Sequence, residues 1–417
     1  MAELPSPQVG STPQWVADHL ADVVRGDVVA PSRRGGQSAA DAALEAFNVR
    51  GYAARRSEVW PVDRRGASGL SPYIRHGLLT LQRVWDHVAS GPARDVSAFR
   101  DELLWQEYAR HLYARLGVAT RRSLRFDVPE RTDGAYPWPR EMACVDLAVG
   151  ELVREGWLPN QMRMWLASQW AVRDGAGWRN GEDEFFRHLL DGSRAANRVG
   201  WQWTVGALTG KPYGFSRWQV KKRAPGLCAT CPLASHCPIE EWPPEDPPDP
   251  RAYVDPRLRR GGEQAQPGAT TSVVPVSTNG APAAVDATNR RAPEAVWITA
   301  ESLGDDDPAL AAHSDLPVHF VWDLPLLQRL RLAPGRLVFL ADALADLASR
   351  RELQVHLGDP REELVGLALA ATAAPVPGWS LRAEALDISA VYPWPWLVPP
   401  HDGPVTSFTA WRRRARV

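Results

Sequence analysis

The feature that most constrains this chain is the stretch of residues 178–203, which reads WRNGEDEFFRHLLDGSRAANRVGWQW. Its first half repeats apolar residues at helical spacing, and Asp191-Gly192-Ser193 then interrupts the pattern as a turn. Any one of its indoles is explained by an ordinary core, because Trp is a large apolar side chain. The order of the residues is therefore more informative than the number of tryptophans. An acidic residue, an amide and three indoles share this short span: Asp191, Asn197, Trp178, Trp201 and Trp203.

The length and charge of the chain set the outer limits of the interpretation. At 417 residues it is long enough for two domains, each with its own core. The net charge of −1 is unevenly distributed. Residues 31–225 hold 30 Lys and Arg against 21 Asp and Glu, a net +9, and the rest of the chain holds −10. A basic half is typical of a polyanion-binding face, and a solvated Arg-rich surface is the alternative.

Targeting signals are not evident in the sequence. The first residues show neither the basic nor the apolar region of a secretory signal. The longest apolar run, around residues 364–377, contains prolines and is too short to cross a bilayer. We therefore expect a cytoplasmic protein with no membrane partner.

The pattern along the chain predicts two domains of different class. Residues 31–243 repeat apolar positions at helical spacing and predict an all-α domain. Residues 244–293 are rich in Pro, Gly, Ser and Thr and predict a flexible linker. Residues 294–417 predict a Rossmann-like α/β domain with a parallel sheet, and residues 1–30 a short lead-in. The expected strands are 296–299, 318–322 and 353–357, and the expected helices between them are 307–312 and 337–351.

Three of the four cysteines stand together as C-x2-C-x5-C, at Cys228, Cys231 and Cys237. In a reducing compartment, thiols this close favour a soft metal or a cluster over a disulfide framework. Cys144 lies far from them in the sequence, and by itself it is more typical of a small buried apolar residue than of a ligand.

Four motifs, taken in order, make residues 35–220 resemble the helical FAD-binding domain of the photolyase/cryptochrome family. SGLSPYIRHGLL is similar to that family's phosphate turn and DELLWQEYARHL to its substrate-facing helix, while GWLPNQMRM and DGSRAAN–GWQW are similar to its isoalloxazine pocket. Three later segments, VWITAESLGDDDPAL, PVHFVWD and VTSFTAWRRR, resemble the family's antenna-type α/β domain. That domain comes first in the family, so the resemblance implies a circular permutation here.

The resemblance assigns roles residue by residue. FAD contacts are implied for Tyr52, Ser68, Leu70, Ser71, Gln106, Trp157, Asn160, Arg163, Asp191 and Asn197, with Asn197 at the flavin N5 and Arg163 paired with Asp191. The substrate cavity is implied for Glu102, Trp105, Met164 and Trp203, and a DNA phosphate contact for Arg56. Trp201 and Trp178 match the first two members of the electron-transfer chain, with Trp138 and Trp170 as candidates for the third. Ala67 and Gly69 depart from the Thr and Arg that are usual at the phosphate turn.

The cysteine pattern is similar to that of the iron–sulfur branch of the family, which has one cluster cysteine at the offset of Cys144 and three after the flavin core. This resemblance implies a [4Fe–4S] cluster, with zinc as the alternative. That branch usually carries paired histidines where Pro159-Asn160 stand here, which argues against (6–4) lesion chemistry. Thr299 and Ala300 replace arginines that normally follow the first strand, which argues against an antenna chromophore.

The function implied by the resemblance is light-driven repair of cyclobutane pyrimidine dimers in damaged DNA, with an electron passing from reduced FAD to the lesion. Two alternatives belong to other classes of protein. One is a cryptochrome-type photosensor that binds a signalling partner and repairs nothing, and the other is a light-independent nucleic-acid-binding module.

Overall fold

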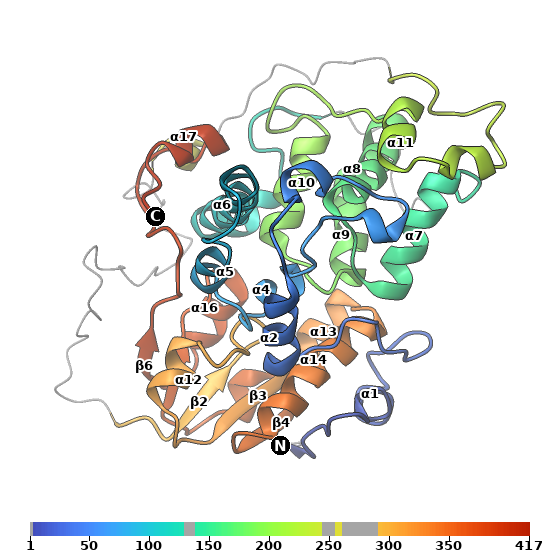
Figure 1. The fold of residues 1–417 in the computed structure, drawn as a ribbon. Coiled ribbons are helices and arrows are strands. Elements are labelled where there is room, and N and C mark those ends of the chain that lie inside the picture. Colours follow the sequence, from blue (N-terminus) through green and yellow to red (C-terminus); the bar gives the residue numbers. More distant parts are fainter. Residues whose placement is uncertain (1–2, 129–137, 244–254, 261–290) are drawn as a thin grey trace.

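The computed structural model describes residues 3–128, 138–243, 255–260 and 291–417, which form a helical unit and a sheet-containing unit (Figure 1). Most of the linker predicted over residues 244–293 lies outside the described residues. One hydrophobic core runs through both units, and a second core lies within the helical unit around Trp165 and Trp201. Of the helices the structure describes, none combines the length and the apolar composition that a bilayer span requires.

The sheet contains five parallel strands and one antiparallel edge strand. Its order is β1-β4-β3-β2-β5-β6, and β3 pairs with β4 from Val318↔Leu353 to Asp323↔Gly358. Strands β2, β3 and β5 are buried throughout, as is usual for the central strands of a parallel sheet. The order of the parallel strands is that of a doubly wound fold, which confirms the α/β content that the sequence predicts. The strands are β1 (Glu3–Leu4), β2 (Ala295–Ile298), β3 (Val318–Asp323), β4 (Leu353–Gly358), β5 (Leu369–Thr372) and β6 (Ile388–Tyr392).

The N-terminal residues belong to the same unit as this sheet. Strand β1 pairs with β4 through Leu4↔Val355, and α1 (Thr12–His19) packs on α14. The Thr12 hydroxyl donates a buried hydrogen bond of 2.5 Å to Asp342 on α14. The expected lead-in over residues 1–30 therefore supplies an edge strand and a covering helix. The other helices of this unit are α12 (Pro308–Ala312), α13 (Leu324–Leu330), α14 (Pro334–Ala348), α15 (Pro360–Glu363) and α16 (Pro377–Ala383), and the last helix, α17 (Phe408–Arg412), packs against α6 of the helical unit.

The helical unit is organised around α6, a helix of 24 residues that begins after Pro92 and ends where Gly117 takes a φ of 54°. Its apolar stripe from Leu103 to Leu116 is buried, because it faces the shared core. In the described part of residues 35–225, every regular element is a helix. The helices are α2 (Gln37–Ala46), α3 (Tyr52–Arg55), α4 (Ser71–Arg75), α5 (Leu81–His87), α6 (Ala93–Leu116), α7 (Ala143–Glu155), α8 (Asn160–Ser168), α9 (Trp178–His188), α10 (Arg194–Thr204) and α11 (Arg217–Arg223), with short turns η1 (Val62–Arg64), η2 (Gly117–Arg121), η3 (Gln169–Arg173), η4 (Leu227–Thr230) and η5 (Pro256–Leu258).

Candidate functional site

The turn between α9 and α10 carries a buried ion pair. Asp191 lies in this turn and accepts two hydrogen bonds from Arg163 of α8, at 2.7 and 3.1 Å. Burial raises the pKa of the Asp191 carboxyl, but Arg163, Ser71 and Arg336 together lower it, and the net pKa lies below the ordinary value. Asp191 is therefore a carboxylate at neutral pH, held in one orientation by a bidentate partner.

A second group of side chains lies beside this pair. The Trp157 indole Nε1 donates to the Ser71 hydroxyl at 3.1 Å, and the Ser71 hydroxyl also lowers the pKa of Asp191 through a hydrogen bond. Ser71 begins α4, directly after the Ser68–Leu70 turn. The structure thus brings together Ser71, Trp157, Arg163 and Asp191, as the resemblance implies.

Arg33 also lies beside the Ser68–Leu70 turn, although it precedes the residues that carry the resemblance. Its guanidinium lies over the Trp157 ring at 4.1 Å and close to Gly69, where a Cβ would be 3.5 Å from it. Gly69 has a φ of 71°, a conformation that favours glycine. Burial lowers the pKa of Arg33, with Tyr73 and Asp191 opposing that change. Arg33 therefore places a positive charge beside position 69 from outside the matched motif.

Asn197 lies on α10, which begins after Ser193, whose hydroxyl accepts from the Ala196 N–H. The Asn197 side chain is buried, at 6% exposed, and its Nδ2 has no hydrogen-bond partner among the residues that the structure describes. An unpaired buried amide costs about 1–3 kcal/mol, so such groups normally have a partner. A donor left open in this way is compatible with a ligand acceptor such as a flavin ring.

The indole rings trace a path away from α10. Trp201, one turn after Asn197, meets Trp170 edge to face at 6.3 Å between ring centroids. Trp170 lies 4.7 Å from Trp138. Trp178, expected as the second member, is buried at the start of α9, where the Arg179 guanidinium lies 5.8 Å above its ring. The ring contacts therefore connect Trp201 to Trp138 through Trp170.

The expected substrate residues on α6, Glu102 and Trp105, are partly exposed and partly in contact with other side chains. Glu102 forms an ion pair with Arg56, and both side chains are about two-fifths exposed. Burial raises the pKa of Glu102, while Arg56 lowers it and the net pKa stays above the ordinary value. Tyr52 is buried nearby, where burial and Glu102 raise its pKa. Trp105 is 38% exposed and stacks on Phe408 of α17, with centroids 4.0 Å apart and planes 11° apart.

The remaining predicted residues lie on α8, α10 and α6 and in the turn before α4. Asn160 begins α8 and donates to the Met164 sulfur at 3.5 Å. Trp203 is half-buried on α10 and packs on Tyr213 at 5.7 Å. Gln106 is half-buried on α6, next to Trp105. Leu70 is fully buried, and its N–H donates to the Ser68 hydroxyl at 3.4 Å.

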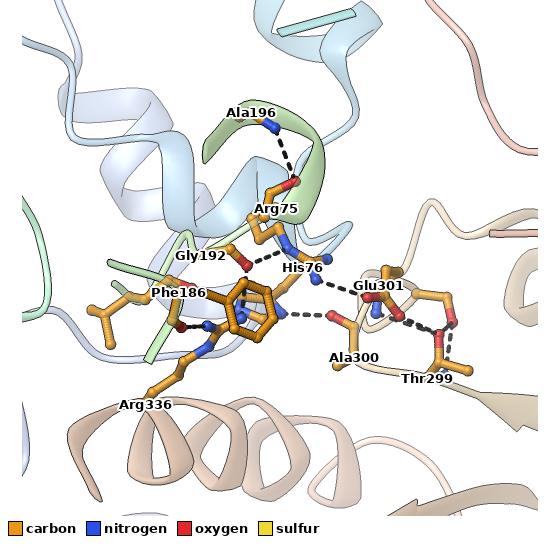
Figure 2. A network of polar contacts seen from close by, with 12 residues as sticks. Arg75, His76, Phe186, Gly192, Ala196, Thr299, Ala300, Glu301 and Arg336 are labelled. Atoms are coloured by element: carbon orange, nitrogen blue, oxygen red, sulfur yellow. Dashed lines mark hydrogen bonds and ion pairs between the residues drawn. The ribbon is translucent and has the colours of Figure 1, made fainter. Parts of the chain in front are cut away.

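Two arginines hold the Asp191 turn, one of them from the sheet-containing unit. The Gly192 carbonyl accepts from Arg75 of α4 at 3.0 Å and from Arg336 of α14 at 2.7 Å (Figure 2). Arg336 is buried and also donates to the Phe186 carbonyl at the end of α9. Its guanidinium lies 4.5 Å over the Phe186 ring. Helix α14 therefore fixes the backbone directly beside Asp191.

The loop after β2 completes this contact between the two units. Arg75 pairs with Glu301 at 2.8 Å. The His76 ring lies between the Ala300 and Leu190 carbonyls, at 2.5 and 2.9 Å (Figure 2). Burial lowers the pKa of His76, so the neutral ring can donate to one of these two oxygens. The Asp191 turn is thus positioned by both units.

All four cysteines line one pocket that is partly open to solvent. Cys144 lies in α7, Cys228 in η4, and Cys231 and Cys237 in the loop that follows. The N–H of Ala143, at the start of α7, donates to the Cys231 sulfur at 3.4 Å. Burial and the three other cysteines raise the pKa of the Cys144 thiol to about 12.

Two arginines face the cysteines. Burial raises the pKa of Cys228 above its ordinary value, and the Arg217 guanidinium opposes this change; Arg217 also interacts with Cys237. Arg173 interacts with Cys237 and Cys144. Positive charge beside thiols favours their ionised form, which is the form that binds metals. Among the residues described, no three His, Cys, Asp or Glu side chains gather closely enough to hold a single metal ion.

Comparisons with known proteins converge on the helical unit. Residues 99–219 match the model of the FAD binding domain of DNA photolyase. The deoxyribodipyrimidine photo-lyase of one Thermus thermophilus strain is 33% identical over 226 residues, covering 51% of this chain and 52% of that protein. That of a Synechococcus strain is 28% identical over 198 residues, covering 41% and 38%.

The chain thus spans about half the length, or less, of these curated relatives. A cryptochrome structure from Synechocystis overlaps 48% of this chain and 46% of its own, at 20% identity and a TM-score of 0.42, a likeness too distant to decide the domain arrangement. The sequence matches support the photolyase/cryptochrome family for the FAD-binding region of this chain.

Proposed function

We propose that this chain is an FAD-dependent, blue-light-driven photolyase-like protein that repairs cyclobutane pyrimidine dimers in DNA. The observation that carries the proposal is the buried amide of Asn197, which has no partner among the described residues and lies within the segment matching the photolyase FAD-binding domain. A cryptochrome-type photosensor with a protein partner is the second candidate. It is favoured by Ala67 and Gly69 at the phosphate turn and by the stacking of Phe408 on Trp105.

Each group of side chains has a role in this proposal. Reduced FAD, when bound, supplies the electron that splits the dimer after a blue photon is absorbed. Asp191, oriented by Arg163, offers a fixed carboxylate, and Asn197 offers an amide donor. Glu102 donates a hydrogen bond or a proton to the flipped base, since its raised pKa favours the protonated form. Trp105 offers an indole on which the base stacks.

The direct test uses a UV-irradiated oligothymidylate and protein whose FAD has been reduced. We expect thymine dimers to disappear under blue light and to persist in a dark sample of the same mixture. Dimers that persist in both samples would favour the photosensor instead.

Arg33 is proposed as a phosphate-binding residue of the FAD site. Its guanidinium lies beside Gly69, and guanidinium groups bind phosphate oxygens in a bidentate manner. Arg33→Gln is expected to weaken FAD binding by about 10–100-fold, because a hydrogen bond to a charged group contributes about 1.5–3 kcal/mol. Titration of flavin-free protein with FAD measures this change. Exposed Arg25→Gln is the control, and equal affinities for the two variants would contradict the assignment.

We assign the four cysteines to a [4Fe–4S] cluster. All four thiols line one pocket of the structure. A four-iron cluster takes one thiolate per iron, and these four cysteines would supply them.

Cys231→Ser is expected to lower iron and acid-labile sulfide per chain by more than half after anaerobic purification. Cys231 is chosen because the start of α7 points an N–H at its sulfur. Thr230→Ser, in the same loop, is the control and should retain both. Zinc without iron or sulfide in the wild type would refute the cluster.

We further propose that the chain is permuted relative to its relatives, with units at residues 31–243 and 294–417 joined by a linker at 244–293. The order of the parallel strands supports this, because β2, the central strand, follows the helical unit. An antenna chromophore is not part of the proposal. Thr299, which replaces an arginine, is instead committed to a hydrogen bond with Glu301 at 3.0 Å.

A further inference from the structure

The last part of the chain, residues 397–416, is fixed along α6, and we call it the C-terminal arm. The buried carboxylate of Glu107 accepts from two backbone N–H groups of the arm, at 2.7 and 3.1 Å. The Tyr108 hydroxyl donates to the Val405 carbonyl at 2.9 Å. Arg115 donates to two further carbonyls of the arm. The path of the arm is therefore set by side chains of the helix that carries Glu102 and Trp105.

Two aromatic residues anchor the end of the arm. Trp411 is fully buried, and its indole Nε1 donates to His111 of α6 at 3.1 Å. Phe408 stacks on Trp105 at 4.0 Å with nearly parallel planes. Helix α17 accordingly packs against α6 (Figure 1). The arm thus covers one face of Trp105 and forms a wall on that side, so the proposed flipped base would stack on the other face of this indole, which is 38% exposed.

Directly after Trp411, the arm presents four exposed arginines: Arg412, Arg413, Arg414 and Arg416. None of the four forms an ion pair within the part of the chain that the structure describes. Asp402 is the single acidic residue of the arm. A run of arginines is ordinarily a solvated surface, but this run follows directly on Trp411, whose buried indole is anchored to α6, the helix that carries Glu102 and Trp105. The position of these arginines on the arm, and not their charge alone, indicates that they bind an anionic partner.

We infer that the C-terminal arm binds the phosphate backbone of the DNA strand whose base enters the cavity, an inference that rests on the proposed function. A strand that places one base against Trp105 must bring its neighbouring phosphates near the wall formed by the arm. Arginine suits that partner because its planar fork matches phosphate oxygens. These contacts add affinity without reading sequence.

The test is the salt dependence of binding to undamaged single-stranded DNA by the full chain. Arg412→Gln, Arg413→Gln and Arg414→Gln are combined in one variant. The slope of log Kobs against log[salt] is expected to become shallower by about two, since each phosphate contact on a single strand contributes about 0.7. The three side chains are exposed, so the melting temperature should not change.

The control combines Arg25→Gln, Arg329→Gln and Arg331→Gln, which removes the same charge from exposed positions. These positions lie beyond α1 and at the end of α13, on the side of the molecule away from α17 (Figure 1). Equal slopes for the two variants, with DNA bound by the wild type, would overturn the inference and leave the proposed function intact. No DNA binding by the wild type, or binding only to anionic phospholipid vesicles, would overturn both.

Discussion

Trp201→Phe is expected to abolish photoreduction of bound oxidised FAD while leaving FAD in place. Trp201 is buried one turn from Asn197, and its ring contacts lead to Trp170 and on to Trp138. Phenylalanine is far harder to oxidise than tryptophan, so the substitution removes the first electron donor. The measurement is the loss of flavin absorbance in blue light with an external reductant present.

Three further variants show whether the effect is specific. Trp165→Phe changes an equally buried indole that stacks on Phe215 at 6.1 Å, and it should photoreduce normally. Trp170→Phe should slow photoreduction more than Trp178→Phe if electrons follow the ring contacts. Photoreduction of Trp201→Phe at the wild-type rate would show that electrons enter by another route.

Glu102→Gln is expected to reduce dimer repair about a hundredfold, at the low end of what a positioned acid contributes. The substitution keeps the size and polarity of the side chain but removes its proton. Burial raises the pKa of Glu102 while Arg56 lowers it, and the net pKa lies above the ordinary value, which favours the protonated carboxyl that the variant lacks. Repair is measured as dimers lost per absorbed photon.

The structural role of Glu102 is separable from this chemical role. Its ion pair with Arg56 is partly exposed, so breaking it should cost at most about 1 kcal/mol of folding free energy. Asp101→Asn, on the exposed face of the same helix, is the control and should repair normally. Equal repair by both variants, with FAD content unchanged, would assign Glu102 to structure alone.

Local patterns predicted much of this fold because they record burial within one element. The stripe on α6 and the apolar runs of β2 and β3 are examples, since each lies in a continuous buried segment. The pairing of β1 with β4 escaped prediction because β1 has two residues, too few for any periodicity. This strand also pairs with residues far along the sequence, Val355 and His356.

The candidate site, like the fold, contains residues that local patterns predicted and residues that they did not. Ser71, Trp157, Arg163 and Asp191 were found because they stand in recognisable motifs, and the structure brings them together. Arg33 and Phe408 were missed because they reach the site from segments outside the helical motifs. Arg336 was missed for the same reason, since it acts from α14 through backbone carbonyls. Contacts of this kind depend on how the two units pack, which local sequence does not encode.

The central claim is that reduced FAD in the helical unit passes an electron to a pyrimidine dimer bound beside Trp105. The most direct measurement is the number of thymine dimers split per absorbed blue photon, in one preparation with its FAD first oxidised and then reduced. The account predicts that splitting rises in proportion to the reduced fraction and stops in the dark. Absence of splitting when FAD is fully reduced and the DNA is bound would contradict it.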